Sequence, residues 1–181
     1  MAEKIVQLKK LMKELDKNEL LLLLSTFRCS RSKDSEYFLG KIALRHDKKS
    51  ISRTYLITDE NVKKVFGYFT LAFKCLDVND PDVTPDIIEL MNLKDNIAQA
   101  YLLGQLARSD DAPKGLGKLM LNKALETFSG GRNMFGCNMI RLDCRDELID
   151  YYTAYGFMQI GKNPERDLTQ MAIFMSDGEW V

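Results

Sequence analysis

The strongest constraint on the fold comes from residues 97–128, where an apolar segment, a polar turn and a helix follow one another directly. Ile97 to Ala107 (IAQAYLLGQLA) has the length and composition of a strand, and Arg108 to Lys114 is polar. From Gly115 to Phe128 apolar residues recur at helical spacing, and Ser129-Gly130-Gly131 predicts the end of the helix. A strand that leads through a turn into a helix predicts an α/β chain, with the helix packed on a sheet.

The rest of the chain continues this mixture of strands and helices. The patterns predict strands at Leu20–Cys29, Arg53–Thr58, Val65–Cys75, Asn138–Cys144, Phe157–Ile160 and Thr169–Met175, helices at Glu36–His46 and Asp146–Tyr155, and a loop at Asp77–Pro85. For Leu20–Cys29 a helix is the competing interpretation. Apolar residues at helical spacing before Lys17 predict an extra N-terminal helix over residues 1–18. We therefore expect a mixed sheet with helices on both faces, in one domain over residues 1–181.

Composition excludes several classes of protein. The chain has 181 residues, of which 45% are hydrophobic and 29% charged, so it is neither disordered nor a fibrous repeat. Four cysteines without a CxxC pair and a single histidine, His46, do not fit the common zinc sites, so we expect no metal. No apolar run approaches the length of a membrane span, and we expect a cytoplasmic protein that contacts no membrane.

Charge is distributed unevenly along a chain whose formal net charge is zero. Residues 1–64 hold 15 Lys and Arg against 9 Asp and Glu, a net charge of +6, and residues 65–181 hold 11 against 17, a net charge of −6. A solvated surface is the simplest explanation. A basic face for an anionic partner is the alternative.

The turn before the helix of residues 115–128 is a candidate phosphate-binding site. Helix N-termini present free N–H groups and a positive dipole to anions, and Gly115 and Gly117 let the main chain approach closely. Lys114 and Lys118 add positive charge there. A dinucleotide motif would need glycine in place of Met120, and a Walker loop would need Ser or Thr after its Gly-Lys, so both are excluded. A glycine turn that only begins a helix is the alternative.

Two motifs resemble the GNAT superfamily of acyl-CoA N-acyltransferases. The first is Lys114-Gly115-Leu116-Gly117, which is similar to the Q/R-x-x-G-x-G/A loop at its glycines, although Ala112 stands where Gln or Arg is usual. The second is YYTAYGF, residues 151–157, which is similar to the F-Y-x-x-x-G-F helix of the superfamily. The segments SRTYLIT, GYFTLA and YLLGQLAR resemble uncharacterised bacterial GNAT proteins of mobile elements and, more distantly, the toxins that acetylate aminoacyl-tRNA.

The resemblance implies a role for each site residue. It places Leu106, Ala107 and Arg108 beside the pantetheine arm of acetyl-CoA, and Lys114, Gly115, Leu116, Gly117 and Lys118 around its pyrophosphate. Tyr152 corresponds to the acid that protonates the leaving thiolate. The general base is left open, with the carboxylates of Asp143, Asp146 and Glu147 near the appropriate strand end. Cys144 is expected to be a core residue rather than a nucleophile.

We therefore expect an acetyltransferase that uses acetyl-CoA as acyl donor. The primary amine of the acceptor is expected to attack the thioester directly. The positive charge of residues 1–64 could face an anionic acceptor such as tRNA. Against this, the whole chain is neutral and its pI of about 6.6 is low for a nucleic-acid-binding chain, which favours a small-molecule or protein amine. A toxin that acetylates aminoacyl-tRNA and a catalytically silent acyl-CoA-binding module are the alternatives. The acceptor, the acyl length and the oligomeric state, for which a homodimer is one alternative, do not follow from the sequence.

Overall fold

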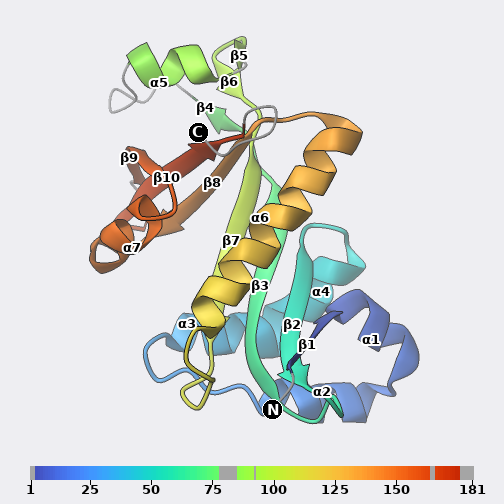
Figure 1. The fold of residues 1–181 in the computed structure, drawn as a ribbon. Coiled ribbons are helices and arrows are strands. Elements are labelled where there is room, and N and C mark those ends of the chain that lie inside the picture. The colour runs from blue at the N-terminus through green and yellow to red at the C-terminus, as the bar shows by residue number, and fades with distance from the viewer. Residues whose placement is uncertain (1–2, 78–84, 92, 164–165, 176–181) are drawn as a thin grey trace. The chain divides into compact units, whose positions relative to one another are not determined.

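The chain forms two compact units that share one long strand and one long helix (Figure 1). The structure is a computed structural model, and it describes residues 3–77, 85–91, 93–163 and 166–175. Unit 1 consists of Met1–Ala72 and Gly104–Leu125, and unit 2 consists of Phe73–Leu103 and Glu126–Val181. The expectation of one domain over residues 1–181 stays a prediction.

A seven-stranded mixed sheet runs through the chain in the order β1-β2-β3-β7-β8-β10-β9. Its strands are β1 (Glu3–Gln7), β2 (Arg53–Asp59), β3 (Val65–Phe73), β7 (Tyr101–Arg108), β8 (Met139–Cys144), β9 (Met158–Asn163) and β10 (Leu168–Phe174). The β7–β8 pair is parallel, whereas the pairs β1–β2, β2–β3, β8–β10 and β9–β10 are antiparallel. A small second sheet contains β4 (Leu76–Asp77), β5 (Leu93–Lys94) and β6 (Ile97–Ala98).

The helices precede the sheet strands or connect them. They are α1 (Leu8–Glu14), α2 (Lys17–Ser25), α3 (Lys33–Tyr37), the π-helical turn η1 (Phe38–Ile42), α4 (Ala43–Lys48), α5 (Pro85–Leu90), α6 (Leu116–Phe135), the 3-10 turn η2 (Asp146–Leu148) and α7 (Ile149–Thr153). Among the residues that the structure describes, no helix has both the length and the apolar character needed to cross a bilayer.

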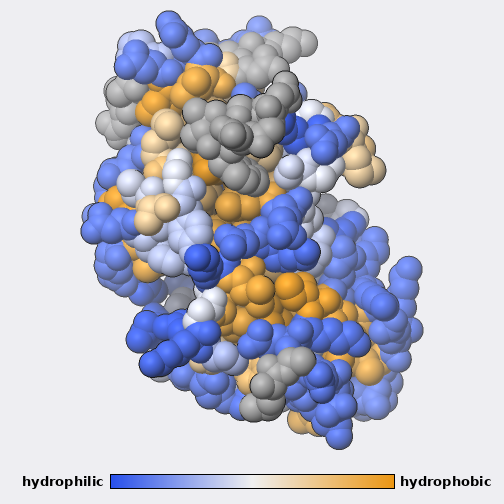
Figure 2. All heavy atoms as spheres, viewed as in Figure 1, coloured by the Kyte–Doolittle hydropathy of each residue, from blue (hydrophilic) through white to orange (hydrophobic). Residues whose placement is uncertain are grey.

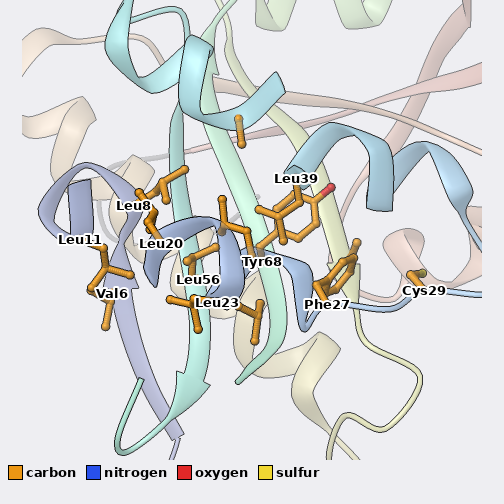
Figure 3. Close-up of a cluster of buried hydrophobic side chains, with 14 residues drawn as sticks. Val6, Leu8, Leu11, Leu20, Leu23, Phe27, Cys29, Leu39, Leu56 and Tyr68 are labelled. Carbon is orange, nitrogen blue, oxygen red and sulfur yellow. The ribbon is translucent and has the colours of Figure 1, made fainter. Parts of the chain in front are cut away.

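The core of unit 1 lies between the strands β2 and β3 and the helices α1, α2, η1 and α4 (Figure 3). Tyr68 is at its centre, fully buried, with its hydroxyl donating to the carbonyl of Ser35 at 2.9 Å. The ring packs edge-on against Phe27, at a centroid distance of 5.2 Å. Because successive residues of a strand face opposite sides of the sheet, Gly67 faces the other side.

The first half of α6 covers that other side. A Cβ at Gly67 would lie 2.8 Å from the sulfur of Met120 and 3.1 Å from a methyl carbon of Leu116, so the helix packs directly on the backbone of β3. Unit 1 therefore has helices on both faces of its strands, as the sequence predicts. The position of the N-terminus of α6 depends on this contact.

Unit 2 contains β8, β9 and β10 together with the small sheet, α5 and α7. Its core holds Met139, Ala172 and Phe174 from the strands, and Met91 and Ala98 from the segment between β3 and β7. The apolar segment Ile97–Ala107 is not one strand but two, β6 and β7. Most of the loop predicted at Asp77–Pro85 lies outside the described residues.

The single helix expected over residues 1–18 is wrong for its first part. Residues 3–7 (EKIVQ) form β1, which pairs antiparallel with β2 from Glu3 opposite Asp59 to Gln7 opposite Tyr55, and the helix α1 begins only at Leu8. Val6 is buried in the core, whereas the charged Glu3 and Lys4 remain exposed. A short edge strand with charged side chains satisfies its backbone by pairing on one side only.

The strand expected at Leu20–Cys29 is also wrong, and the competing helix is confirmed. The helix α2 begins with a capping box, in which the Asp16 carboxylate accepts from the N–H groups of Asn18 and Glu19 while the Glu19 side chain accepts from the Asp16 N–H. This box fixes a helix start at Lys17, and Leu20, Leu23 and Leu24 are buried at helical spacing.

The helix α6 is longer than predicted, because Ser129-Gly130-Gly131 does not end it. A Cβ at Gly131 would lie only 3.1 Å from the Tyr101 hydroxyl, so the glycine allows the helix to pack against this tyrosine. The Tyr101 hydroxyl donates to the Gly136 carbonyl at 2.7 Å, and Gly136 itself, with φ +78°, follows the last helical residue. The helix ends at this glycine, in the position that favours left-handed backbone.

Candidate active site

The predicted phosphate-binding turn, residues 109–115, is held to other segments of unit 1 by main-chain hydrogen bonds. The N–H of Ser109 donates to the carbonyl of Phe66 at 2.7 Å, and the N–H of Asp110 donates to the carbonyl of Arg28 at 2.8 Å. The first bond connects the turn to β3 and the second connects it to the segment between α2 and α3. The path of the chain after β7 is therefore fixed on both sides.

Both acidic side chains of the turn have partners in other segments. The Asp110 carboxylate accepts from the N–H of Ser30 at 2.9 Å and from its hydroxyl at 2.8 Å, and these bonds lower the pKa of Asp110. Asp111 accepts from the ammonium of Lys64 and from the hydroxyl of Ser109, which lower its pKa. Asp111 is thus paired with a cation, whereas Asp110 is held by the neutral donors of Ser30.

The end of the turn has the geometry of an anion site. Gly115 has φ +85°, a left-handed conformation that favours glycine, and a Cβ there would have no neighbour within 4 Å. Gly117 and Lys118 are the second and third residues of α6, so their N–H groups have no carbonyl one turn earlier in the helix. Lys114 and Lys118 are exposed beside these amides, and Leu116 is buried against the sheet.

The β7 residues expected beside the pantetheine arm follow one another at the end of that strand. Ala107 is buried, with its carbonyl oxygen 3.1 Å from the position of a Gly67 Cβ, whereas Leu106 is half-buried and Arg108 exposed. The parallel register of β7 with β8 covers only Tyr101 and Leu102, opposite Ile140 and Arg141, at the beginning of both strands. Ala112, which stands at the usual Gln or Arg position, donates its N–H to the Ser109 carbonyl at 3.1 Å.

Tyr152 lies in unit 2, on α7. Its side chain is buried, with its ring edge-on to Tyr151 at 5.1 Å and to Phe157 at 5.7 Å between centroids. Burial raises the pKa of the Tyr152 phenol above its ordinary value of about 10, and the neighbouring Tyr151 and Cys144 add to the shift. The hydroxyl therefore stays protonated at neutral pH, as a proton donor must.

Cys144 is a core residue, as expected. It is buried at the end of β8, with its sulfur 3.5 Å from that of Met171. Burial raises the pKa of the Cys144 thiol to about 11, so the thiolate needed for nucleophilic attack is scarce at neutral pH. Within the described ranges, no three His, Cys, Asp or Glu side chains come together as ligands for a metal ion.

The three carboxylates proposed as candidate bases differ in their surroundings. Asp146 accepts from the ammonium of Lys162 at 2.7 Å and from the hydroxyl of Thr169 at 2.6 Å, and these partners lower its pKa. Glu147 is exposed, 3.7 Å from the guanidinium of Arg145. Asp143 is bound by two side chains and is mostly buried.

The structure thus brings together the eight residues predicted around acetyl-CoA in one run of unit 1, and it places Tyr152 in unit 2. Their roles stay predictions. Sequence reasoning missed the supports of the turn, Ser30 and Lys64. Ser30 is 80 positions from Asp110, and no local pattern indicates such a contact.

Comparison with known proteins identifies the fold. No family model and no curated protein sequence matches the chain. Among solved structures, AtaT complexed with acetyl-methionyl-tRNAfMet is similar with a TM-score of 0.71 and 17% identity, over 93% of this chain and 94% of that one. A tyrosine-to-phenylalanine mutant of KacT has a TM-score of 0.72 and 17% identity, over 94% of both chains. AtaTR bound with acetyl-CoA has a TM-score of 0.67 and 18% identity, over 93% and 91%. The chain has the fold of these proteins, the GNAT fold predicted from the sequence.

Proposed function

We propose that this GNAT-fold chain is an acetyltransferase that moves the acetyl group of acetyl-CoA to the α-amino group of an aminoacyl-tRNA. The observation on which the proposal depends is the glycine turn at the start of α6, with its positive φ at Gly115, its free N–H groups and its two lysines. A pyrophosphate is the anion that such a turn fits. The fold shared with AtaTR bound with acetyl-CoA supports the same donor.

The residues supply the steps of direct transfer. The amine nitrogen attacks the thioester carbonyl carbon, a C–N bond forms, and a main-chain N–H stabilises the oxyanion. When the C–S bond breaks, the thiolate takes the proton of the Tyr152 hydroxyl, and the proton released by the nitrogen returns to the tyrosine through water. A buried phenol suits this role because it is neutral before the step.

Two observations favour aminoacyl-tRNA over the small amine that the sequence alone favours. The first is the shared fold with AtaT complexed with acetyl-methionyl-tRNAfMet. The second is that net charge differs more between the two units than between residues 1–64 and residues 65–181. Unit 1 holds 19 Lys and Arg against 11 Asp and Glu, a net charge of +8, and unit 2 holds 7 against 15, a net charge of −8.

Part of this positive charge lies on neighbouring helices of unit 1. The helices α1 and α4 pack against each other, and their exposed sides carry Lys10, Lys13 and Lys48, with Lys49 following α4. Hydrophilic residues line the outer edge of the molecule at α1, beside a hydrophobic patch (Figure 2). Lysines that follow a polynucleotide backbone give affinity without base specificity.

The test is acetyl transfer from radiolabelled acetyl-CoA to a mixture of aminoacyl-tRNAs. We expect label in acetyl-aminoacyl esters, and none in deacylated tRNA, which has no α-amine. Label in free amino acids or polyamines but not in aminoacyl-tRNA would refute the acceptor. An enzyme that binds acetyl-CoA and labels no amine would instead be the silent binding module.

The electrostatic part of the proposal has its own test. A face that makes about four phosphate contacts loses roughly 10²-fold in tRNA affinity between 50 and 200 mM salt. Changing Lys10, Lys13, Lys48 and Lys49 to Glu should abolish that binding and leave the affinity for acetyl-CoA unchanged. Equal tRNA binding by both proteins would exclude this face.

A further inference from the structure

A group of buried and half-buried polar side chains lies on one face of β8, β9 and β10 in unit 2. Arg141 is 2% exposed, and its guanidinium donates to one oxygen of Asp143 at 3.0 Å. Asn163 donates its side-chain N–H to the other oxygen at 2.8 Å. Gln170 is opposite Asp143 in the antiparallel register, so its side chain is on the same face. We call these four residues the Arg141 cluster.

The Arg141 cluster is incomplete as it stands. Among the described residues, the Nε of Arg141 and the side-chain oxygen of Gln170 are buried and have no hydrogen-bond partner. The first is an open donor and the second an open acceptor. Buried polar groups in proteins are nearly always paired, so two such atoms in one cluster indicate a ligand.

The buried ion pair is not explained by stability. Replacing a buried pair by apolar residues is often neutral or stabilising, because desolvation offsets the attraction between the charges. Packing of the strand does not need an arginine either, since the core contacts of the opposite face are made by Leu142 and Cys144, which are 2% and 4% exposed. A functional role accounts for the pair better.

Of the three candidate carboxylates, Asp143 is the one whose surrounding hydrogen bonds a ligand can complete. Its side chain is 17% exposed, so one edge is accessible, whereas the guanidinium that fixes it is 3% exposed. Each of the three carboxylates is paired with a cation, but only the partner of Asp143 is buried and keeps an open N–H group, whereas Lys162 and Arg145 are exposed. Position alone does not separate the three carboxylates, but their partners do.

We propose that Asp143 receives the amino group of the acceptor, with Gln170 as a second hydrogen-bond acceptor and with Arg141 and Asn163 as positioning residues. An amine has the N–H donors that Asp143 and Gln170 need. The open Nε–H of Arg141 needs an acceptor, such as the carbonyl oxygen next to an α-amine. The ligand class is therefore an α-aminoacyl group, and this inference rests on the proposed function.

The test compares two isosteric variants, one at the end of β8 and one shortly after it. Asp143→Asn should raise KM for methionyl-tRNA about 10- to 100-fold and leave KM for acetyl-CoA within twofold, because the carboxylate contacts only the acceptor. Asp150→Asn, at an exposed carboxylate a few residues after the same strand, should leave both constants within twofold. Similar losses in the two variants, or a matching rise in KM for acetyl-CoA, would overturn the assignment.

A second variant guards against loss of folding. Gln170→Met removes the open acceptor and leaves the Arg141–Asp143 pair in place, so it should raise KM for methionyl-tRNA in the same direction, with an unchanged unfolding midpoint. An unchanged KM would overturn the role of Gln170 and the aminoacyl class. Wild-type protein that acetylates no amine would overturn the proposed function and this inference together, whereas an active wild type with unaffected variants overturns the inference alone.

Discussion

Replacing Tyr152 by Phe removes a single oxygen from a buried ring. The two ring contacts, to Tyr151 and Phe157, are made by atoms that phenylalanine also has. We therefore expect the free energy of unfolding to change by no more than about 1 kcal/mol, a small effect for a buried position. The proposed acid for the leaving thiolate is lost completely.

The expected loss in kcat is about 10²- to 10⁴-fold, the range of general acid catalysis, which corresponds to about 3 to 5 kcal/mol of activation free energy. The affinity for acetyl-CoA should stay within twofold, because its contacts are predicted in the turn and in β7. Single-turnover transfer to methionyl-tRNA measures the chemical step, and calorimetry measures donor binding.

Tyr151→Phe is the matched control, since it removes the same oxygen from the preceding residue. We expect it to lower kcat by less than about fivefold, well below the range of general acid catalysis. The pH profile gives a further check. Burial raises the pKa of Tyr152, so its proton is retained above pH 10 and the wild type should show no alkaline decline from this group below that pH. Equal losses in the two variants, or none, would refute the assignment of Tyr152.

Three further predictions concern the turn and its supports. Gly117→Asp should abolish acetyl-CoA binding in calorimetry without loss of helix, because an acidic residue suits a helix start but repels a pyrophosphate, whereas Gly130→Asp, on the exposed part of α6, should bind normally. Gly67→Ala should lower the free energy of unfolding, measured in urea, by about 1 to 3 kcal/mol, because a Cβ at this position has no room. Gly40→Ala, where a Cβ has open space, should not lower it. Equal effects of the two variants would contradict the packing of α6 on β3. Asp110→Ala should weaken acetyl-CoA binding about three- to tenfold through loss of its charged hydrogen bonds, and Asp110→Asn should restore part of the affinity; an unaffected alanine variant would show that the turn needs no such support.

Sequence patterns predicted the elements whose signals are local. The strand, turn and helix from Tyr101 onward and the strand β8 are predicted because period, turn and helix start lie within a few residues. The error at Leu20 arose because a short apolar run fits a strand or a helix equally well, and only the capping box at Asp16 separates them. The error at Gly130-Gly131 arose because glycine ends one helix and allows close packing in another.

The residues of the candidate site also fall into two groups, those that local motifs predict and those that only the folded chain brings together. Gly115, Gly117 and Tyr152 belong to motifs that a single sequence contains. The partners of Asp110 and Asp143 come from segments 80 and 20 residues away, brought close by strand register and by chain reversal. Register and side-chain burial result from the packing of the whole chain, so neither the supports of the turn nor the Arg141 cluster could be predicted.

The division of unit 1 into two stretches of chain has a consequence for synthesis on the ribosome. Residues up to Ala72 emerge first, but the unit also needs Gly104–Leu125. At about 5 to 20 residues per second, the 31 residues from Phe73 to Leu103 take about 2 to 6 s to be added. During that interval β3 has β2 on one side and no β7 on the other, so a strand destined for the interior is exposed as a sheet edge. The nascent chain therefore passes through a stage in which β3, mostly buried in the folded chain, is exposed as a sheet edge that could pair with another chain. This stage ends only when the second half of β7 and the start of α6 leave the exit tunnel.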